Sequence, residues 1–213
     1  MQKSLTGRTI RLLVGLWLFA LGSVLTLRAS LGVPPWDVLH DGIRQNTPLS
    51  FGVAVIAIGV LLVLVSALFG VRPGPGTIAN MLLIGTYVDL MLWTGIGADL
   101  DDAHMAARVA TTLSGVAVVG LGSALYIGAN LGAGPRDSLM VLAATKLGVR
   151  VGVARAAIEG TALLVGWLLG GAVGIGTLLF VVAIGPSVDV FFRLFRMEAD
   201  GRRAEAVAER TAA

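Results

Sequence analysis

The chain has 213 residues, of which 56% are hydrophobic and 14% are charged, and its mean hydropathy is +0.87. This composition excludes an ordinary water-soluble domain and is typical of a protein that lies in a lipid bilayer. The net charge of +3 does not indicate a nucleic-acid partner, because the basic residues lie at the ends of apolar segments rather than on one polar face.

Six apolar runs approach the roughly 20 residues that a membrane-spanning helix needs. They cover residues 10–27, 51–71, 77–93, 109–127, 151–169 and 175–195. The first run follows Lys3, Arg8 and Arg11 and resembles a signal peptide. It continues to Arg28 without a convincing small-residue cleavage site, so we interpret it as an uncleaved span.

Two shorter segments, 34–47 and 135–148, each begin with proline-containing sequence. A helix of about 14 residues reaches only about 20 Å, which is less than the roughly 30 Å hydrocarbon core. We therefore expect each segment to form a re-entrant or interfacial helix that does not cross. The predicted fold is an all-α polytopic membrane protein with six transmembrane helices.

The chain repeats itself after 100 residues. Between 8–93 and 108–193, about 29 of about 86 aligned pairs are identical, where composition alone gives roughly one in ten. The matching motifs include Ala29-Ser-Leu-Gly-Val-Pro-Pro-Trp-Asp-Val-Leu39 with Ala129-Asn-Leu-Gly-Ala-Gly-Pro-Arg-Asp-Ser-Leu139, and Val88-Asp89 with Val188-Asp189. We therefore divide the chain into a first membrane repeat (8–96), an outer linker (97–107), a second membrane repeat (108–196) and a polar tail (197–213).

Three crossings in each repeat predict that the second repeat is inverted relative to the first. With the N-terminus in the cytoplasm, only three of the 16 Lys and Arg residues fall on the outer side, namely Arg28, Arg44 and Arg108. This excess of basic residues on one side agrees with the positive-inside rule. We expect both termini to be cytoplasmic in a bacterial inner membrane.

The motifs Leu31-Gly-Val-Pro-Pro-Trp-Asp-Val-Leu39, Leu49-Ser-Phe-Gly52 and Arg72-Pro-Gly-Pro-Gly-Thr77 follow one another along the first repeat. With Ile84-Gly85 and Val88-Asp89 after them, the chain resembles the YczE/YitT-type family of bacterial integral membrane proteins from about residue 8 to 195. The resemblance implies a small multi-pass protein of the bacterial cytoplasmic membrane. It implies no substrate and no catalytic residue, because the activity of that family is largely uncharacterised.

The two short helices supply the first candidate site residues, Asp37, Asp137 and Arg136. A proline at the first helical position with a carboxylate in the first turn is explained by helix capping and the helix dipole alone. The alternative is that the broken helices present free N–H groups and polar side chains to a solute, as in inverted-repeat transporters. Arg136 takes the place of Trp36, so the second copy would attract an anion.

Glu159 lies near the middle of the fifth span, where a carboxylate costs roughly 2.5 to 3.5 kcal/mol. Arg155 lies one turn earlier, so the two side chains are expected to pair. The pair is either structural or part of a substrate or ion pathway. It interrupts the repeat, because the equivalent residues are Val55 and Gly59.

Further polar pairs are expected near helix ends. Asp189 has Arg193 four residues later, and Asp89 has Arg28 or Arg108 as candidate partners on the outer face. His40 is expected to be a surface polar residue rather than a metal ligand. The sequence has no cysteine and no nucleophile-base motif.

We therefore predict a secondary transporter or permease for a small solute, with no cofactor, no metal and no enzymatic activity. Small-residue faces favour a homodimer within the lipid bilayer. The alternative is a scaffold or regulatory partner of another membrane or biosynthetic protein, which does not transport. A water-accessible centre distinguishes the two, because a scaffold does not need one.

Overall fold

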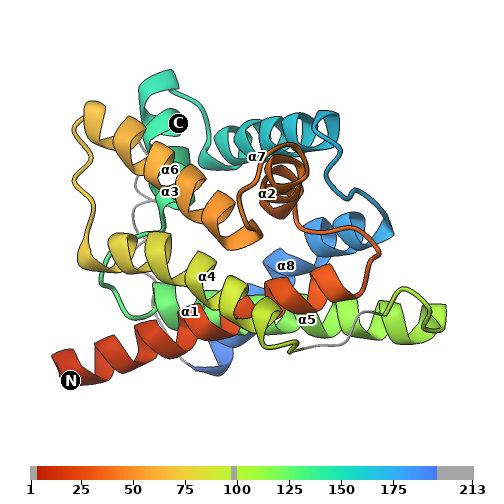
Figure 1. Ribbon diagram of the computed structural model, residues 1–213. Helices are drawn as coiled ribbons and strands as arrows, with labels where there is room; N and C mark the ends of the chain where they lie inside the picture. Colours follow the sequence, from red (N-terminus) through yellow and green to blue (C-terminus); the bar gives the residue numbers. More distant parts are fainter. Residues whose placement is uncertain (1–3, 97–99, 196–213) are drawn as a thin grey trace.

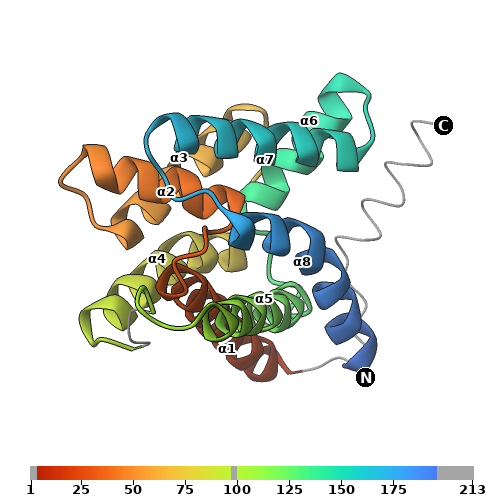
Figure 2. The ribbon, with the colours of Figure 1, turned by 90° about the vertical axis from the view of Figure 1, so that its right-hand side faces the viewer.

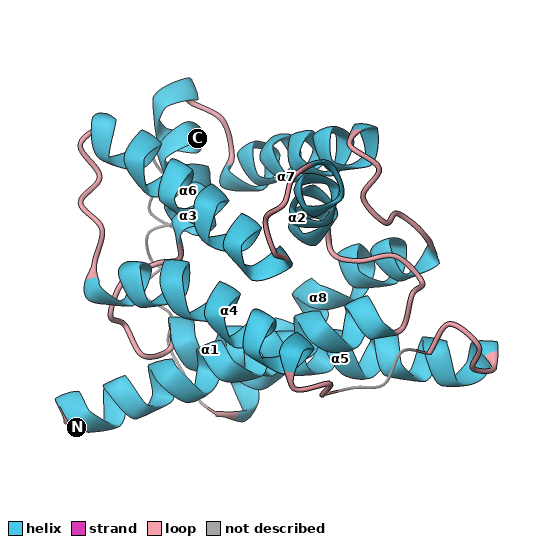
Figure 3. Ribbon diagram, viewed as in Figure 1, coloured by secondary structure: helices cyan, strands magenta, loops and turns pink. Residues whose placement is uncertain are grey.

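The computed structural model describes residues 4–96 and 100–195, and the predicted all-α class is confirmed (Figure 3). Within these ranges the chain forms helices joined by loops, without a strand. The helices are α1 (Leu5–Arg28), α2 (Pro35–Asn46), α3 (Phe51–Leu68), α4 (Pro75–Trp93), α5 (Met105–Ile127), α6 (Pro135–Leu147), α7 (Val151–Leu168) and α8 (Ile175–Leu194).

Six of these helices, α1, α3, α4, α5, α7 and α8, are long and apolar enough to cross a membrane. They coincide with the six predicted spans to within a few residues. The helices α2 and α6 have 12 and 13 residues and coincide with the two short segments. α5 begins at Met105, inside the predicted linker 97–107. The predicted tail 197–213 and residues 97–99 of the linker lie outside the described residues.

The helices form two layers (Figures 1 and 2). One layer contains α1, α4, α5 and α8, in which α1 packs on α5 and α4, and α5 packs on α8. The other contains α2, α3, α6 and α7, in which α2 packs on α7 and α3, and α6 packs on α3 and α7. Each layer therefore takes two helices from each half of the chain.

Helices α1 and α5 cross in close contact through four glycines. A Cβ atom at Gly22 would lie 2.7 Å from the carbonyl oxygen of Gly115, and one at Gly15 would lie 2.9 Å from that of Gly122. The lower-numbered glycine of α1 meets the higher-numbered glycine of α5, so the two helices are antiparallel. Small residues allow this approach of the backbones.

Two arginines connect the ends of α1 and α5 in matching ways. Arg8 donates from Nε to the carbonyl of Ala129 at 2.8 Å and from Nη2 to that of Asn130. Arg108, which is 100 residues later, donates from Nε to Ala29 at 3.0 Å and from Nη2 to Ser30. Each arginine thus satisfies carbonyls that follow the last turn of the other helix.

The loops after α1 and α5 contact the first turns of α8 and α4 through a second matching pair of hydrogen bonds. Gly176 N–H donates to the carbonyl of Leu31 at 2.7 Å, and Gly76 N–H donates to that of Leu131 at 2.8 Å. The residues after these leucines are Gly32 and Gly132, which have φ of 97° and 127°. These angles favour glycine, since other residues rarely adopt them.

The halves differ in how their last two helices pack. In the first half α3 packs along α4, where a Cβ atom at Gly85 would lie 2.3 Å from the carbonyl oxygen of Gly52. In the second half the equivalent glycines, Gly152 and Gly185, are exposed, and a Cβ atom at either would have nothing within 4 Å. The facing surfaces of α7 and α8 are therefore separated where those of α3 and α4 touch.

Candidate functional site

The first turn of α2 places Asp37 inside the protein, 3% exposed. Pro35 starts the helix without loss of a hydrogen bond, because the first helical N–H has no partner within the helix. Asp37 accepts a 2.8 Å hydrogen bond from the hydroxyl of Ser23 on α1, and its other oxygen lies 3.2 Å from Nδ1 of His40. Burial raises the pKa of Asp37, but the interactions with His40, Arg136 and Ser23 outweigh it and hold the pKa below its usual value.

The prediction that His40 is a surface residue is wrong. The side chain is 0% exposed and packs edge-to-face on Phe51, with 5.8 Å between the ring centroids. α2 lies between α3 and α7, so its polar face is enclosed as well as its apolar face. Burial lowers the pKa of His40 and the hydrogen bond with Asp37 offsets only part of this, so the ring is neutral at pH 7.

The first turn of α6 places Arg136 over Trp36 of the other short helix, with its Cζ atom 4.9 Å from the ring centroid. This distance is that of a cation–π contact. Trp36 packs among Leu62, Met140 and Ala162, so its ring is fixed by α3, α6 and α7. Trp36 and Arg136, which occupy equivalent positions in the two repeats, are therefore in contact.

Asp137 lies next to Arg136 and accepts a 3.0 Å hydrogen bond from the hydroxyl of Tyr126 on α5. It is less buried than Asp37. A Cβ atom at Gly134 would lie 3.1 Å from Oδ2 of Asp137 and 3.5 Å from Nδ2 of Asn80. Asn80 belongs to α4, so α4 also lies close to the start of α6. The N-termini of α2 and α6 thus lie beside polar side chains from both layers.

On α7, Nε of Arg155 donates to Oε1 of Glu159 at 3.0 Å. The Arg155 side chain is 52% exposed and that of Glu159 is 27% exposed. Glu159 is one of the carboxylates whose charge acts on Arg136, together with Asp37 and Asp137. Because Arg155 pairs with Glu159 and the charges of Asp37, Asp137 and Glu159 act on Arg136, we call these five predicted pathway residues the central cluster: Asp37, Arg136, Asp137, Arg155 and Glu159.

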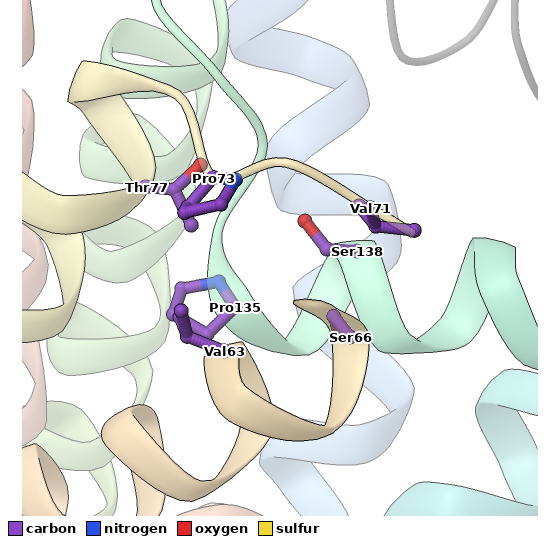
Figure 4. A pocket seen from close by; sticks show the side chains of 7 residues that line it. All are labelled: Val63, Ser66, Val71, Pro73, Thr77, Pro135 and Ser138. Carbon is purple, nitrogen blue, oxygen red and sulfur yellow. The ribbon is translucent and has the colours of Figure 1, made fainter. Parts of the chain in front are cut away.

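A small hollow lies beside this cluster, where α6 begins against the end of α3 (Figure 4). Its volume is about 10 Å³, and its lining includes Ser66, Pro135 and Ser138. This is room for about one water molecule. The hollow is therefore too small for a solute, and α3 and α6 are closely packed at this point.

A larger groove of about 560 Å³ lies where α1, α2 and α4 end and α3 begins. Arg28, Arg44 and Asp89 contribute to its lining. The partners of Asp89 differ from the predicted arginines, because its carboxylate accepts hydrogen bonds from Ser50 Oγ and, at 2.7 Å, from Gly52 N–H. Arg108 instead donates to the loop after α1. Asp89 therefore binds the N-terminus of α3 to the end of α4.

The equivalent residue, Asp189, lies in α8 one turn before Arg193, near the end of that helix. Neither belongs to the central cluster. Among the described residues, no group of three or more His, Asp or Glu side chains is placed to hold a metal ion.

Sequence reasoning did not find Ser23, Trp36 and Tyr126 as partners in the central cluster. Ser23 and Tyr126 lie in apolar spans without a motif, and the motif that contains Trp36 does not show that Arg136 packs on its ring. The contacts by which Arg8 and Arg108 connect α1 and α5 could have been predicted from the repeat, because an arginine occurs at both equivalent positions.

Comparison with known proteins places these features in a family. The chain matches a family of unknown function (DUF6198) over residues 6–193. It is 35% identical over 183 residues to an uncharacterized protein of Haemophilus influenzae, covering 86% of this chain and 82% of that protein. It is 35% identical over 187 residues to the uncharacterized membrane protein YczE of Bacillus subtilis, covering 87% and 85%. It is also 26% identical to the uncharacterized protein YyaS of the same organism over 187 residues, covering 84% and 89%.

No solved structure matches the chain. The family match covers most of the sequence, and the six apolar helices agree with the description of YczE as a membrane protein. This protein is therefore a multi-pass membrane protein that belongs to the YczE-type family of uncharacterised membrane proteins, DUF6198.

Proposed function

We propose that this protein is a secondary transporter or permease for a small solute and that it works by alternating access. The observation that carries the proposal is the difference between equivalent helix pairs. The contact of Gly52 with Gly85 joins α3 to α4, whereas Gly152 and Gly185 are exposed and separate. In inverted-repeat transporters, access alternates by rocking or gating of one repeat or bundle against the other around a fixed site.

The antiparallel crossing of α1 and α5 supports two inverted repeats. The contacts of Arg8 with Ala129 and of Arg108 with Ala29 are related by exchange of the halves. The contacts of Gly76 with Leu131 and of Gly176 with Leu31 are related by the same exchange of the halves. A pseudo-two-fold axis in the membrane plane produces such a set of contacts.

The distribution of basic residues gives the proposed orientation in a bacterial cytoplasmic membrane. With both termini in the cytoplasm, the closed α3–α4 contact faces outward and the separated ends of α7 and α8 face inward. On this proposal the separated ends of α7 and α8 correspond to an inward-facing conformation. Movement of α2, α3, α6 and α7 as a layer would open α3 from α4 and close α7 on α8.

Closure of α7 on α8 is directly testable, because the chain has no native cysteine. Ile56 Cγ1 would lie 2.8 Å from a Cβ atom at Gly85, so the equivalent positions Ala156 and Gly185 are expected to meet in the alternate state. We expect Ala156→Cys with Gly185→Cys to be cross-linked within one chain by a short bifunctional thiol reagent in native membranes. Mass spectrometry of the linked peptides measures the product.

Each single variant is the matched control and should give no intrachain product. A longer reagent that spans the separated helices tests whether both thiols are reactive. Cross-linking by the longer reagent alone contradicts alternating access. It would favour the second candidate, a static scaffold or regulatory partner, for which the closely packed α3–α6 contact is the supporting observation.

A further inference from the structure

The central cluster has an unequal balance of hydrogen-bond donors and acceptors. Its carboxylates already accept hydrogen bonds: Asp37 from Ser23 and His40, Asp137 from Tyr126, and Glu159 from Arg155. Buried polar groups are normally satisfied in this way, because an unpaired one costs free energy. The carboxylates of the cluster therefore do not call for a further ligand.

Two donor groups at the cluster, from Trp36 beside it and from Arg136 within it, have no hydrogen-bond acceptor among the described residues. The indole N–H of Trp36 is buried without a hydrogen-bond partner, in a side chain that is 7% exposed. The guanidinium of Arg136, which is partly exposed, lies over that same ring and makes no hydrogen bond within residues 4–96 and 100–195. The charges of Asp37, Asp137 and Glu159 act on it as well. A guanidinium carries five N–H donors and no acceptor.

The backbone of α6 adds to this donor set. Arg136 is the second residue of α6, and the N-cap residue Gly134 provides no side-chain hydrogen bond to the first turn. The free N–H groups and the dipole at a helix N-terminus attract negative charge. Arg136, Trp36 and the first turn of α6 therefore all offer donors from adjacent positions.

A cationic solute fits this arrangement less well. The face of Trp36 that would attract a cation is already covered by Arg136. A carboxylate or another small oxyanion instead supplies acceptors to the buried indole N–H of Trp36 and to the partly exposed guanidinium of Arg136, which binds such groups in bidentate geometry. We propose that the transported solute carries an oxyanion group, which is bound by Arg136 and by the indole N–H of Trp36. This inference rests on the proposed transport function.

Ligand binding to the purified protein in lipid nanodiscs tests this assignment, because a ligand that binds the folded state raises the melting temperature. The probes are sodium acetate and sodium phosphate, with tetramethylammonium chloride as the cation and sodium chloride at equal ionic strength as the reference. We expect acetate, phosphate or both to raise the melting temperature of the wild type with saturation. Acetate would indicate an organic acid and phosphate an inorganic oxyanion, and either supports the site.

Arg136→Gln should raise the half-saturating anion concentration at least tenfold, and Trp36→Phe, which keeps the ring and removes the N–H, should raise it several-fold. Arg72→Gln removes the same charge from the exposed loop after α3 and should leave it unchanged. If Arg136→Gln does not fold, the half-saturating anion concentration of Trp36→Phe tests the site by itself.

Stabilisation by tetramethylammonium alone, by neither anion, or equally in wild type and Trp36→Phe overturns the assignment. These results are independent of the thiol cross-link. If α7 closes on α8 but no anion binds, the oxyanion site is contradicted and the proposed transport is not. If an anion binds but α7 does not close on α8, the proposed transport is contradicted and the anion site is supported.

Discussion

Gly22→Val is expected to lower the free energy of unfolding by about 3 kcal/mol, which is the upper part of the usual range for overpacking. A Cβ atom at Gly22 would lie 2.6 Å from Val119 Cγ2 and 2.7 Å from the backbone of Gly115 and Val119 on α5. Backbone atoms cannot rotate away as a flexible side chain can, so α1 and α5 must separate. The melting temperature in nanodiscs, followed by circular dichroism, measures the loss.

Gly160→Val is the matched control for this substitution. Gly160 also lies in the middle of a spanning helix, α7, but a Cβ atom there would have nothing within 4 Å. The control should melt within a few degrees of the wild type. Equal melting temperatures of the two variants would contradict the glycine-mediated crossing of α1 and α5.

Alanine substitutions at the two equivalent aspartates are expected to shift the conformational equilibrium in opposite directions. Asp89 holds α3 to α4 through Ser50 and Gly52, so Asp89→Ala should release the contact between α3 and α4. In the second half, α7 begins after Arg150 without a side-chain cap. On the proposed function, closure would bring Asp189 to the N–H of Gly152 and to Arg150, so Asp189→Ala should weaken the contact between α7 and α8 in the closed state.

Hydrogen bonds to a charged group contribute about 1.5 to 3 kcal/mol, which corresponds to a shift of about tenfold or more in a two-state equilibrium. In the background of Ala156→Cys with Gly185→Cys, Asp89→Ala should increase the initial rate of cross-linking by about this factor, and Asp189→Ala should decrease it. A change in the same direction for both variants would show that the two aspartates do not stabilise opposite states.

The helices of this protein could be predicted from the sequence because each signal was local. Apolar runs of sufficient length gave the six spans, and Pro35 and Pro135 gave the starts of the two short helices. The pairing of Arg155 with Glu159 followed from their spacing on one helix. In each case the relevant residues lie within a few turns of one another.

The contacts that make the central cluster could not be predicted in the same way, because they join distant segments. Arg136 meets Trp36 only because the halves exchange partners, so that α2 packs on α7 and α6 packs on α3. His40 was predicted to be a surface residue because it is a lone histidine on a short amphipathic helix, but α3 and α7 enclose it. Packing between the two layers decided both outcomes.

The separation of Gly152 from Gly185 is a further feature that the repeat conceals. Both glycines are identical to their first-half equivalents, so the sequence predicts equal packing in the two halves. α8 contains Pro186 where α4 has Thr86, and proline removes a backbone hydrogen bond within a helix. The identical glycines therefore do not by themselves specify how closely the two helix pairs pack.

The inversion of the two halves across the membrane is the claim on which the proposed transport cycle depends, and thiol labelling tests it most directly. Thr47 and Leu147 are exposed and occupy equivalent positions in the two repeats. Thr47 follows the last residue of α2, and Leu147 is the last residue of α6. With single cysteines at these positions, a membrane-impermeant thiol reagent should label position 47 in intact cells and position 147 only after permeabilisation. Labelling of both positions from the outside of intact cells would contradict inversion and, with it, the alternating-access mechanism.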